Sequence, residues 1–218
     1  MKLLALACAT RGGGACLISD DAVHVEEYPP EITGGRGLLP AARHCLERGG
    51  LSARDLDYVA VCIGPGSFTG IRVGLAAALA LVEASGAALL GLDSLSVLHH
   101  NARELLRPED TVGALLGAGR GLVYVRRFRG GEPLEEPALM SLDVLLEQRP
   151  AEVYLGRIPE SLAERLAPER LLQGFATLRP RPLAEATLMR IEDDARLDPL
   201  AARPLYLKRP PAKPLEGR

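Results

Sequence analysis

Short apolar or alternating runs and longer runs with helical spacing take turns along the chain, which predicts a mixture of strands and helices. Residues 2–8, 15–19 and 22–28 have strand length and are separated by Gly12–Gly13–Gly14 and by Asp20–Asp21. Apolar runs of this length between turn residues predict an antiparallel meander of three strands.

Strands and helices alternate after the meander. The segment LLPAARHCLERGG has a helical apolar face and ends at Gly49–Gly50, and residues 70–85 predict a second helix that Gly86 closes. The runs YVAVCIG and AALLG predict buried strands, and Asp93 is placed to cap a third helix over SLSVLHHNARELL. This alternation predicts a mixed sheet with right-handed crossovers. The apolar face of the first helix carries Leu38, Leu39, Ala42, Cys45 and Leu46.

The pattern restarts near Pro108. The runs TVGALLGAG and LVYVRRF, separated by a Gly-rich turn, predict a second hairpin, and proline and charge become denser toward the final KRPPAKPLEGR. We therefore expect two α/β lobes. Residues 1–104 would form the N-terminal lobe, residues 105–207 the C-terminal lobe, and residues 208–218 a mobile, basic and proline-rich tail.

Composition narrows the class of protein. With 47% hydrophobic and 25% charged residues the chain resembles a soluble globular protein, and its net charge of −2 and 4% aromatic content disfavour a stand-alone nucleic-acid binder. The first residues, MKLLALACAT, mimic a signal peptide, but a first strand fits them better, and no run approaches the roughly 20 apolar residues of a membrane span. Cys8, Cys16, Cys45 and Cys62 lack a CxxC pattern, so we expect buried, reduced thiols in a cytoplasmic protein.

The glycine-rich stretch GPGSFTGIRVG, residues 64–74, follows a predicted strand and begins a predicted helix. It fits neither the Walker pattern G-x-x-x-x-G-K-[ST] nor the dinucleotide pattern G-x-G-x-x-G. What remains is a helix start with free backbone N–H groups, which favours an anion only weakly. The residues of this weak phosphate-loop-like site would be Gly64, Pro65, Gly66, Ser67 and Thr69.

Small residues recur every four positions on the same predicted helix, at Gly70, Gly74 and Ala78, with Ala77 and Leu81 beside them. A stripe of this kind lets another backbone approach closely. Two interpretations stay open: the stripe packs on the protein's own sheet, or it contacts another molecule. Spacing alone favours the first.

GPGSFTGIRVG closely resembles the GPGSFTG-(L/I)-R-(I/V)-G signature of the bacterial TsaB (YeaZ) proteins. Softer similarity runs along the chain in LLP at 38–40, GLVYVRRF at 121–128, SLDVLLE at 141–147 and PLYLKRP at 204–210. The resemblance implies an α/β fold with two lobes of the sugar kinase, Hsp70 and actin type, which is ribonuclease H-like and has mixed sheets.

The resemblance also implies a function. TsaB proteins are subunits of the machinery that places threonylcarbamoyl on the adenosine next to the anticodon in certain tRNAs. The chain would be a non-catalytic scaffold that pairs with a catalytic TsaD-type paralogue and a TsaE-type ATPase, forms a homodimer when alone, meets tRNA only through the complex and does not bind membranes. Because the family's contact surface includes the helix after GPGSFTG, the resemblance favours an intermolecular contact for it. The predicted interface is Phe68, Gly70, Arg72, Gly74, Ala77, Ala78 and Leu81.

Metal and catalytic residues are not expected. The catalytic relatives carry a metal-binding H-x-x-x-H, whose positions fall near Ser94 and Leu98 here. His99 and His100 are adjacent, so on a helix they diverge by about 100° and cannot readily bind one ion.

Nucleotide binding is also not expected, so no cofactor is predicted. The family's Asp-Thr at the end of the first strand is replaced by Ala7–Cys8, its His-Ser by Gly34–Gly35, and its Asp-Ala-Arg by Gly117–Ala118–Gly119. Each change removes a charge or a donor from the region between the lobes, and a magnesium–phosphate site needs a carboxylate.

Two alternatives belong to other classes of function. The first is a stand-alone ATP-dependent or peptidase-like enzyme of the same fold, for which Ser67 lacks the G-x-S-x-G context of a nucleophile. The second is direct tRNA binding through basic residues. Those residues would be Arg126, Arg127, Arg129, Lys208, Arg209 and Lys213.

Overall fold

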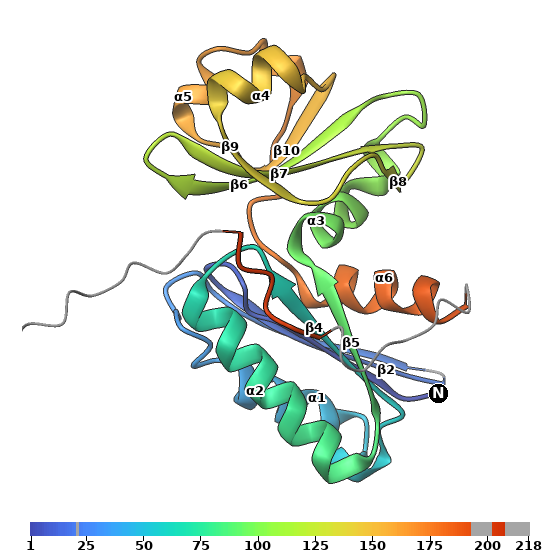
Figure 1. The fold of residues 1–218 in the computed structure, drawn as a ribbon. Helices are drawn as coiled ribbons and strands as arrows, with labels where there is room; N and C mark the ends of the chain where they lie inside the picture. The colour runs from blue at the N-terminus through green and yellow to red at the C-terminus, as the bar shows by residue number, and fades with distance from the viewer. Residues whose placement is uncertain (21, 193–201, 208–218) are drawn as a thin grey trace, which may run out of the picture.

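Two mixed sheets lie one above the other, with helices between them and on both outer faces (Figure 1). A computed structural model of the chain describes residues 1–20, 22–192 and 202–207. The α/β architecture predicted from the alternation of strand-length and helix-length runs is therefore confirmed.

The first sheet has the strand order β3-β2-β1-β4-β5. Strands β1, β2 and β3 pair antiparallel, whereas β1, β4 and β5 pair parallel. The predicted meander and the mixed sheet are both confirmed. The strands are β1 (Leu3–Ala7), β2 (Gly13–Ser19), β3 (Ala22–Tyr28), β4 (Tyr58–Gly64) and β5 (Ala88–Asp93).

Helices α1 (Leu38–Arg48) and α2 (Phe68–Ser85) cover one face of this sheet, and α3 (Ser94–Ala102) and α6 (Pro180–Glu192) lie on the other side (Figure 1). Local sequence sets their ends. Ser67 caps α2 and Asp93 caps α3 through side-chain oxygens that accept backbone N–H groups, while Gly86 ends α2 with φ of 75°.

The second sheet has the order β11-β10-β6-β7-β8, with β9 paired to β7. Strands β6 and β7 form the predicted hairpin, and α4 and α5 cover the outer face of the sheet (Figure 1). Its elements are β6 (Val112–Gly119), β7 (Leu122–Arg129), β8 (Glu132–Pro133), β9 (Ala138–Ser141), β10 (Val153–Arg157), β11 (Leu171–Leu172), α4 (Leu142–Gln148) and α5 (Glu160–Ala163). Short 3-10 turns lie at Ala53–Asp55, Arg103–Leu105 and Pro168–Arg170.

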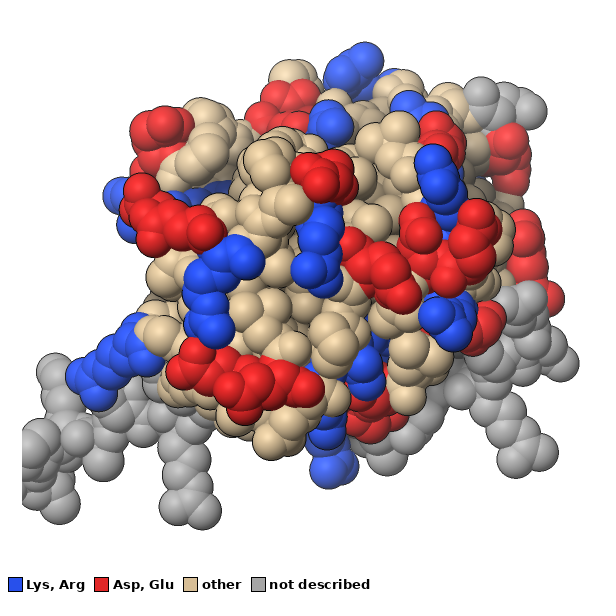
Figure 2. Space-filling model, turned by 90° about the horizontal axis from the view of Figure 1, so that it is seen from above, with Lys and Arg blue, Asp and Glu red and all other residues tan. Residues whose placement is uncertain are grey.

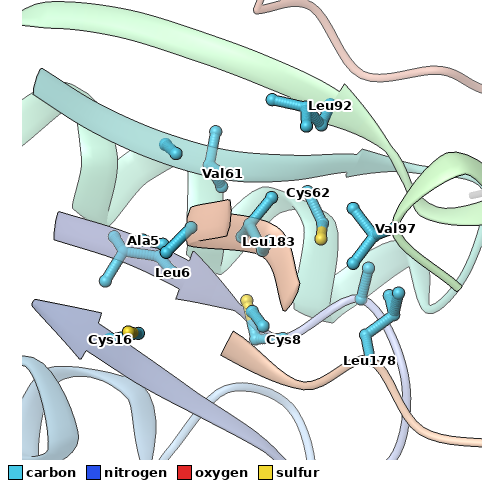
Figure 3. Close-up of a cluster of buried hydrophobic side chains, with 14 of the residues drawn as sticks. Ala5, Leu6, Cys8, Cys16, Val61, Cys62, Leu92, Val97, Leu178 and Leu183 are labelled. Atoms are coloured by element: carbon cyan, nitrogen blue, oxygen red, sulfur yellow. The ribbon is translucent and has the colours of Figure 1, made fainter. Parts of the chain in front are cut away.

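The main core joins both sheets through α3 and α6. Figure 3 shows part of it, where Cys8 and Cys62 lie among apolar side chains that include Val97 and Leu183. All four cysteines are free and buried, as the sequence predicts. Burial raises the pKa of the Cys8 and Cys16 thiols to about 12, so both stay protonated at neutral pH.

Helix α6 follows the second sheet in the chain but packs on β1 and β2 of the first. Residues 180–192 therefore lie with the first sheet, although the predicted division placed them in the C-terminal lobe of residues 105–207. The division into an N-terminal lobe of residues 1–104 and a C-terminal lobe of residues 105–207 stays a prediction. The predicted tail at 208–218 lies outside the described residues.

Candidate protein-interaction surface

The GPGSFTG loop sits directly on the backbone that follows β1. The Ser67 N–H donates to the Ala9 carbonyl oxygen at 2.7 Å, and a Cβ on Gly66 would overlap that same carbonyl. The peptide bond between Gly64 and Pro65 is cis. The contacts with Ala9 make the loop a close-packed turn against the backbone that follows β1.

The donors at the start of α2 are partly used within the chain. Ser67 Oγ accepts the Gly70 N–H at 3.2 Å, while the Thr69 side chain is exposed. Ala7 and Cys8, which replace the Asp-Thr pair that the resemblance would place at the end of β1, are buried, and the Cys8 thiol donates to the Gly70 carbonyl at 3.0 Å. This arrangement explains the glycines by packing, and the weak phosphate-loop-like site stays a prediction.

The stripe of small residues on α2 faces the protein's own sheet. A Cβ on Gly70 would overlap the Cys8 carbonyl, and one on Gly74 would lie 2.7 Å from Cys8 Sγ and 3.2 Å from Val61 Cγ2. Ala78 is fully buried, and Ala77 is 8% exposed. Cys8 and Val61 therefore occupy the face of α2 at Gly70 and Gly74, which fits packing on the protein's own sheet. A contact of Gly70, Gly74, Ala77 and Ala78 with another molecule stays a prediction.

The opposite face of α2 is exposed and largely apolar. Phe68 is 38% exposed and Leu79 is 55% exposed, and Ala76 is also exposed. By helical spacing they share an outward row with Arg72 and Glu83. The 18-residue helix has a mean hydropathy of 1.4, so its length and composition alone would allow it to cross a membrane. Only 33% of it is buried. Because one face of α2 packs on the first sheet, α2 is instead a helix of the α/β fold whose second apolar face is exposed.

Helix α1 extends this apolar surface. Leu39 is 59% exposed and lies with Leu81 of α2 along a groove of about 690 Å³. Exposed apolar patches with a polar rim mark sites of protein–protein contact. We call this surface the α1–α2 face; its residues are Leu39, Pro40, Phe68, Arg72, Ala76, Leu79, Ala80, Leu81 and Glu83.

The adjacent histidines of α3 have separate partners. The buried His99 ring stacks on Phe128 with centroids 4.2 Å apart, and His100 Nε2 lies 3.7 Å from a Glu185 carboxylate oxygen. Within the described ranges, no group of three or more His, Cys, Asp and Glu side chains is arranged to hold a metal ion.

The three arginines of β7 face carboxylates. Arg126 Nη1 donates to Asp93 Oδ2 at 2.8 Å, and Arg127 Nε donates to Glu135 at 2.9 Å, which lowers the pKa of that carboxyl. Arg129 Nη2 lies 3.9 Å from Glu152. Figure 2 shows acidic and basic side chains interspersed over the face seen from above. This geometry does not support a tRNA site at these arginines; Lys208, Arg209 and Lys213 lie outside the described residues.

Comparison with known proteins gives consistent relatives. A family model described as "TsaD: tRNA N6-adenosine threonylcarbamoyltransferase" matches residues 35–151. The chain is 26% identical to "tRNA threonylcarbamoyladenosine biosynthesis protein TsaB" of Bacillus subtilis over the whole of both chains, and 33% identical to the protein of the same description from Escherichia coli over 61% of this chain and 57% of that one. It is 32% identical to an uncharacterized protein of Mycobacterium leprae over 82% of this chain, but spans only 45% of that relative. The solved structure "YeaZ from Pseudomonas aeruginosa" matches with a TM-score of 0.79 at 22% identity, over 94% of this chain and 99% of that one.

The two mixed sheets and the helices between them define a protein of the actin-like, ribonuclease H-like class, with an apolar helix face after its GPGSFTG loop. The fold predicted from the resemblance is confirmed. Within that class, the chain belongs to the TsaD-related family and, inside it, to the TsaB (YeaZ) proteins.

The interface predicted from the sequence lies on α2 and stays a prediction. Of its residues, Phe68 and Arg72 are exposed and Leu81 is half-buried. Sequence reasoning did not include the exposed apolar residues Leu39 and Leu79. The sequence did contain an indication of the second face. Helix α2 is apolar on nearly all sides, and a helix of that kind is normally buried on more than one side.

Proposed function

We propose that this protein is a non-catalytic subunit for the synthesis of threonylcarbamoyladenosine in tRNA, and that it acts by pairing with a TsaD-type catalytic paralogue. The names of its relatives in Bacillus subtilis and Escherichia coli support the pathway. The observation that carries the pairing is the uncovered α1–α2 face, with Leu39 and Leu79 both more than half exposed.

The buried end of β1 supports an accessory role. Ala7, which is fully buried, stands where the resemblance would place an acidic residue at the end of β1. The Ser67 hydroxyl is already used as the cap of α2. A subunit of this kind needs no metal or nucleotide of its own. In this proposal the protein works in the cytoplasm, forms a homodimer when alone, joins a TsaE-type ATPase through the complex, and reaches tRNA only through it.

The α1–α2 face is tested by the solution mass of the protein alone and mixed with its TsaD-type partner, measured by light scattering on a sizing column. Wild type should form a dimer alone and a one-to-one complex with the partner. Leu79→Arg should raise the dissociation constant of the complex by about 10- to 100-fold, because it places a charge in an apolar contact.

Leu134→Arg is the matched control, since Leu134 is 50% exposed on the second sheet, beside β8. It should pair like wild type. Equal pairing by both variants would remove the α1–α2 face from the proposal. A wild-type protein that ignores the partner, and that adds nothing to threonylcarbamoyladenosine formation in a reconstituted reaction read by mass spectrometry, would refute the function itself.

A further inference from the structure

The segment 202–207, separated from β4 by most of the chain, returns to lie beside it (Figure 1). The Leu205 N–H donates to the Ile63 carbonyl at 2.8 Å. Glycines make room for it: a Cβ on Gly64 would lie 3.0 Å from the Leu205 carbonyl oxygen, and one on Gly91 would lie 3.0 Å from Ala202 Cα. The C-terminal segment is therefore seated on the ends of β4 and β5, next to the start of α2.

Tyr206 completes a cluster with the first turns of α2. Its ring lies 5.1 Å from that of Phe68, centroid to centroid, and its hydroxyl accepts the Arg72 Nε–H at 3.1 Å. The Arg72 guanidinium carbon lies 3.9 Å above the centre of the Phe68 ring. We call these three side chains the Arg72 cluster.

The Arg72 cluster holds an exposed guanidinium in a defined orientation. Tyr206 accepts from Nε and the Phe68 ring lies against the guanidinium, while no hydrogen bond or ion pair within the described residues takes up Nη1 or Nη2. The fork that these two nitrogens form matches the two oxygens of a carboxylate. An arginine that is already oriented loses less side-chain entropy when it binds than a mobile one does.

The outward row of α2 carries a positive charge near one end and a negative charge near the other. Arg72 lies near the start of the row, Glu83 near its end, and Ala76 and Leu79 lie between them, all exposed. The rise of the helix separates the two charges by about 16 Å, so they cannot pair within one chain. A row with a cation at one end, an anion at the other and an apolar centre is complementary to itself when two copies run antiparallel.

We propose that Tyr206 positions Arg72 to bind Glu83 of a second copy of this chain, in a two-fold contact where the two α2 helices run antiparallel. The pair would form twice, once at each end, around the apolar centre at Ala76 and Leu79. The C-terminal segment thus becomes part of the interface through Tyr206. This inference rests on the homodimer of the proposed function and adds the residues that set its register.

A protein partner suits the Arg72 cluster better than RNA. The outward row continues from Arg72 into apolar Ala76 and Leu79, which offer nothing to a phosphate backbone. Aromatic and arginine side chains beside an apolar centre are typical of the energetic centres of protein interfaces.

Charge reversal tests the pair directly. Analytical ultracentrifugation of the full chain at low salt should show Arg72→Glu and Glu83→Arg each raising the dimer dissociation constant at least about tenfold. The double variant R72E/E83R should return to within about threefold of wild type, because the swapped charges pair again. A double variant at least as weak as the weaker single variant would overturn the proposal.

Tyr206 has its own test. Tyr206→Phe keeps the ring on Phe68 but removes the acceptor for Arg72, so the dimer should weaken several-fold and lose part of its salt dependence. Arg203→Ala, an exposed change in the same C-terminal segment, is the matched control and should leave the dimer unchanged. Equal dimerisation by wild type and Tyr206→Phe would refute the positioning role.

The remaining outcomes separate this inference from the proposed function. If Arg72→Glu dimerises like wild type but loses affinity for tRNA, the cluster is a nucleic-acid contact and the inference is wrong. If charge reversal rescues the dimer while the TsaD-type partner does not bind, the inference stands and the proposed function fails. If the partner binds but the rescue fails, the inference alone is lost.

Discussion

At the scale of single residues, the close approach of two backbones explains the GPGSFTG motif better than ligand chemistry does. Gly70 meets the Cys8 carbonyl, and the Gly66 backbone meets that of Ala9. A side chain at either position would force β1 and α2 apart. The motif therefore fixes how α2 sits on the sheet, and this in turn decides which side chains α2 presents outward.

Gly70→Ala should destabilise the protein by at least about 2 kcal/mol, although glycine to alanine inside a helix normally stabilises by about 1 kcal/mol. The sign reverses because the new Cβ would overlap a backbone carbonyl, which cannot move aside. Urea unfolding followed by circular dichroism measures this.

Gly74→Ala serves as the matched comparison. Its Cβ would meet the Cys8 side chain, 2.7 Å from Sγ, and a side chain can shift. We expect a smaller loss than at Gly70. A Gly70→Ala variant as stable as wild type would show that α2 does not sit this close to β1.

At the scale of elements, the burial of His99 in α3 outweighs the stabilisation that a helix C-terminus gives to a positive charge. His99 lies in the last turn of α3, where a positive charge is normally stabilised. Its ring is nevertheless buried against Phe128, and burial, followed by repulsion from His100, lowers its pKa to about 4. His99 is therefore a neutral packing residue that ties α3 to β7.

The depressed pKa of His99 predicts a loss of stability in acid. An unfolded histidine titrates near about 6.5, so the unfolded state takes up a proton first and the free energy of unfolding falls as the pH drops from about 6.5 toward 4. We expect this residue to contribute about 1–2 kcal/mol of loss between about pH 7 and pH 4.5. Unfolding curves at several pH values measure it.

His99→Phe isolates that contribution from the carboxylates, which also titrate in this range. The variant keeps a ring on Phe128 but cannot bind a proton, so its stability should fall less steeply with acid than that of wild type. Parallel pH profiles for the two proteins would contradict the buried, neutral state of His99.

At the scale of the whole molecule, the Asp93–Arg126 ion pair joins the two sheets. Asp93 ends β5 and caps α3, whereas Arg126 belongs to β7, and both side chains are about nine-tenths buried at 8% and 11% exposure. Arg126 also donates to Ser96 Oγ and to the Glu135 carbonyl. The second sheet is thereby held to the first by charge as well as by the shared core.

Arg126→Ala should lower the free energy of unfolding by about 3–5 kcal/mol, because it leaves the Asp93 carboxylate buried with one fewer partner. Arg129→Ala on the same strand should cost less than about 0.5 kcal/mol, since the Arg129–Glu152 pair is more than half exposed. Urea unfolding compares them. Similar losses for both variants would argue against a structural role for the Asp93–Arg126 pair.

The sequence by itself determined the elements and the family. Strand-length runs, helical spacing, the caps Asp93 and Gly86 and the GPGSFTG motif are local signals, and local periodicity reports which face of each element is apolar. For this reason the meander, α1, α2, α3 and the β6–β7 hairpin were all predicted, as was the burial of the four cysteines.

Only the tertiary structure decided which of two apolar faces of α2 is covered, since the spacing of Gly70, Gly74 and Ala78 is compatible with both interpretations. It also brought α6 back to the first sheet, joined Arg126 to Asp93, and placed Tyr206 on Phe68 and Arg72. The contacts of Arg126 and Tyr206 join residues 33 and 134 positions apart in the sequence, to Asp93 and to Arg72 respectively. The free energy of such contacts depends on how the sheets and helices pack, and no local spacing encodes it.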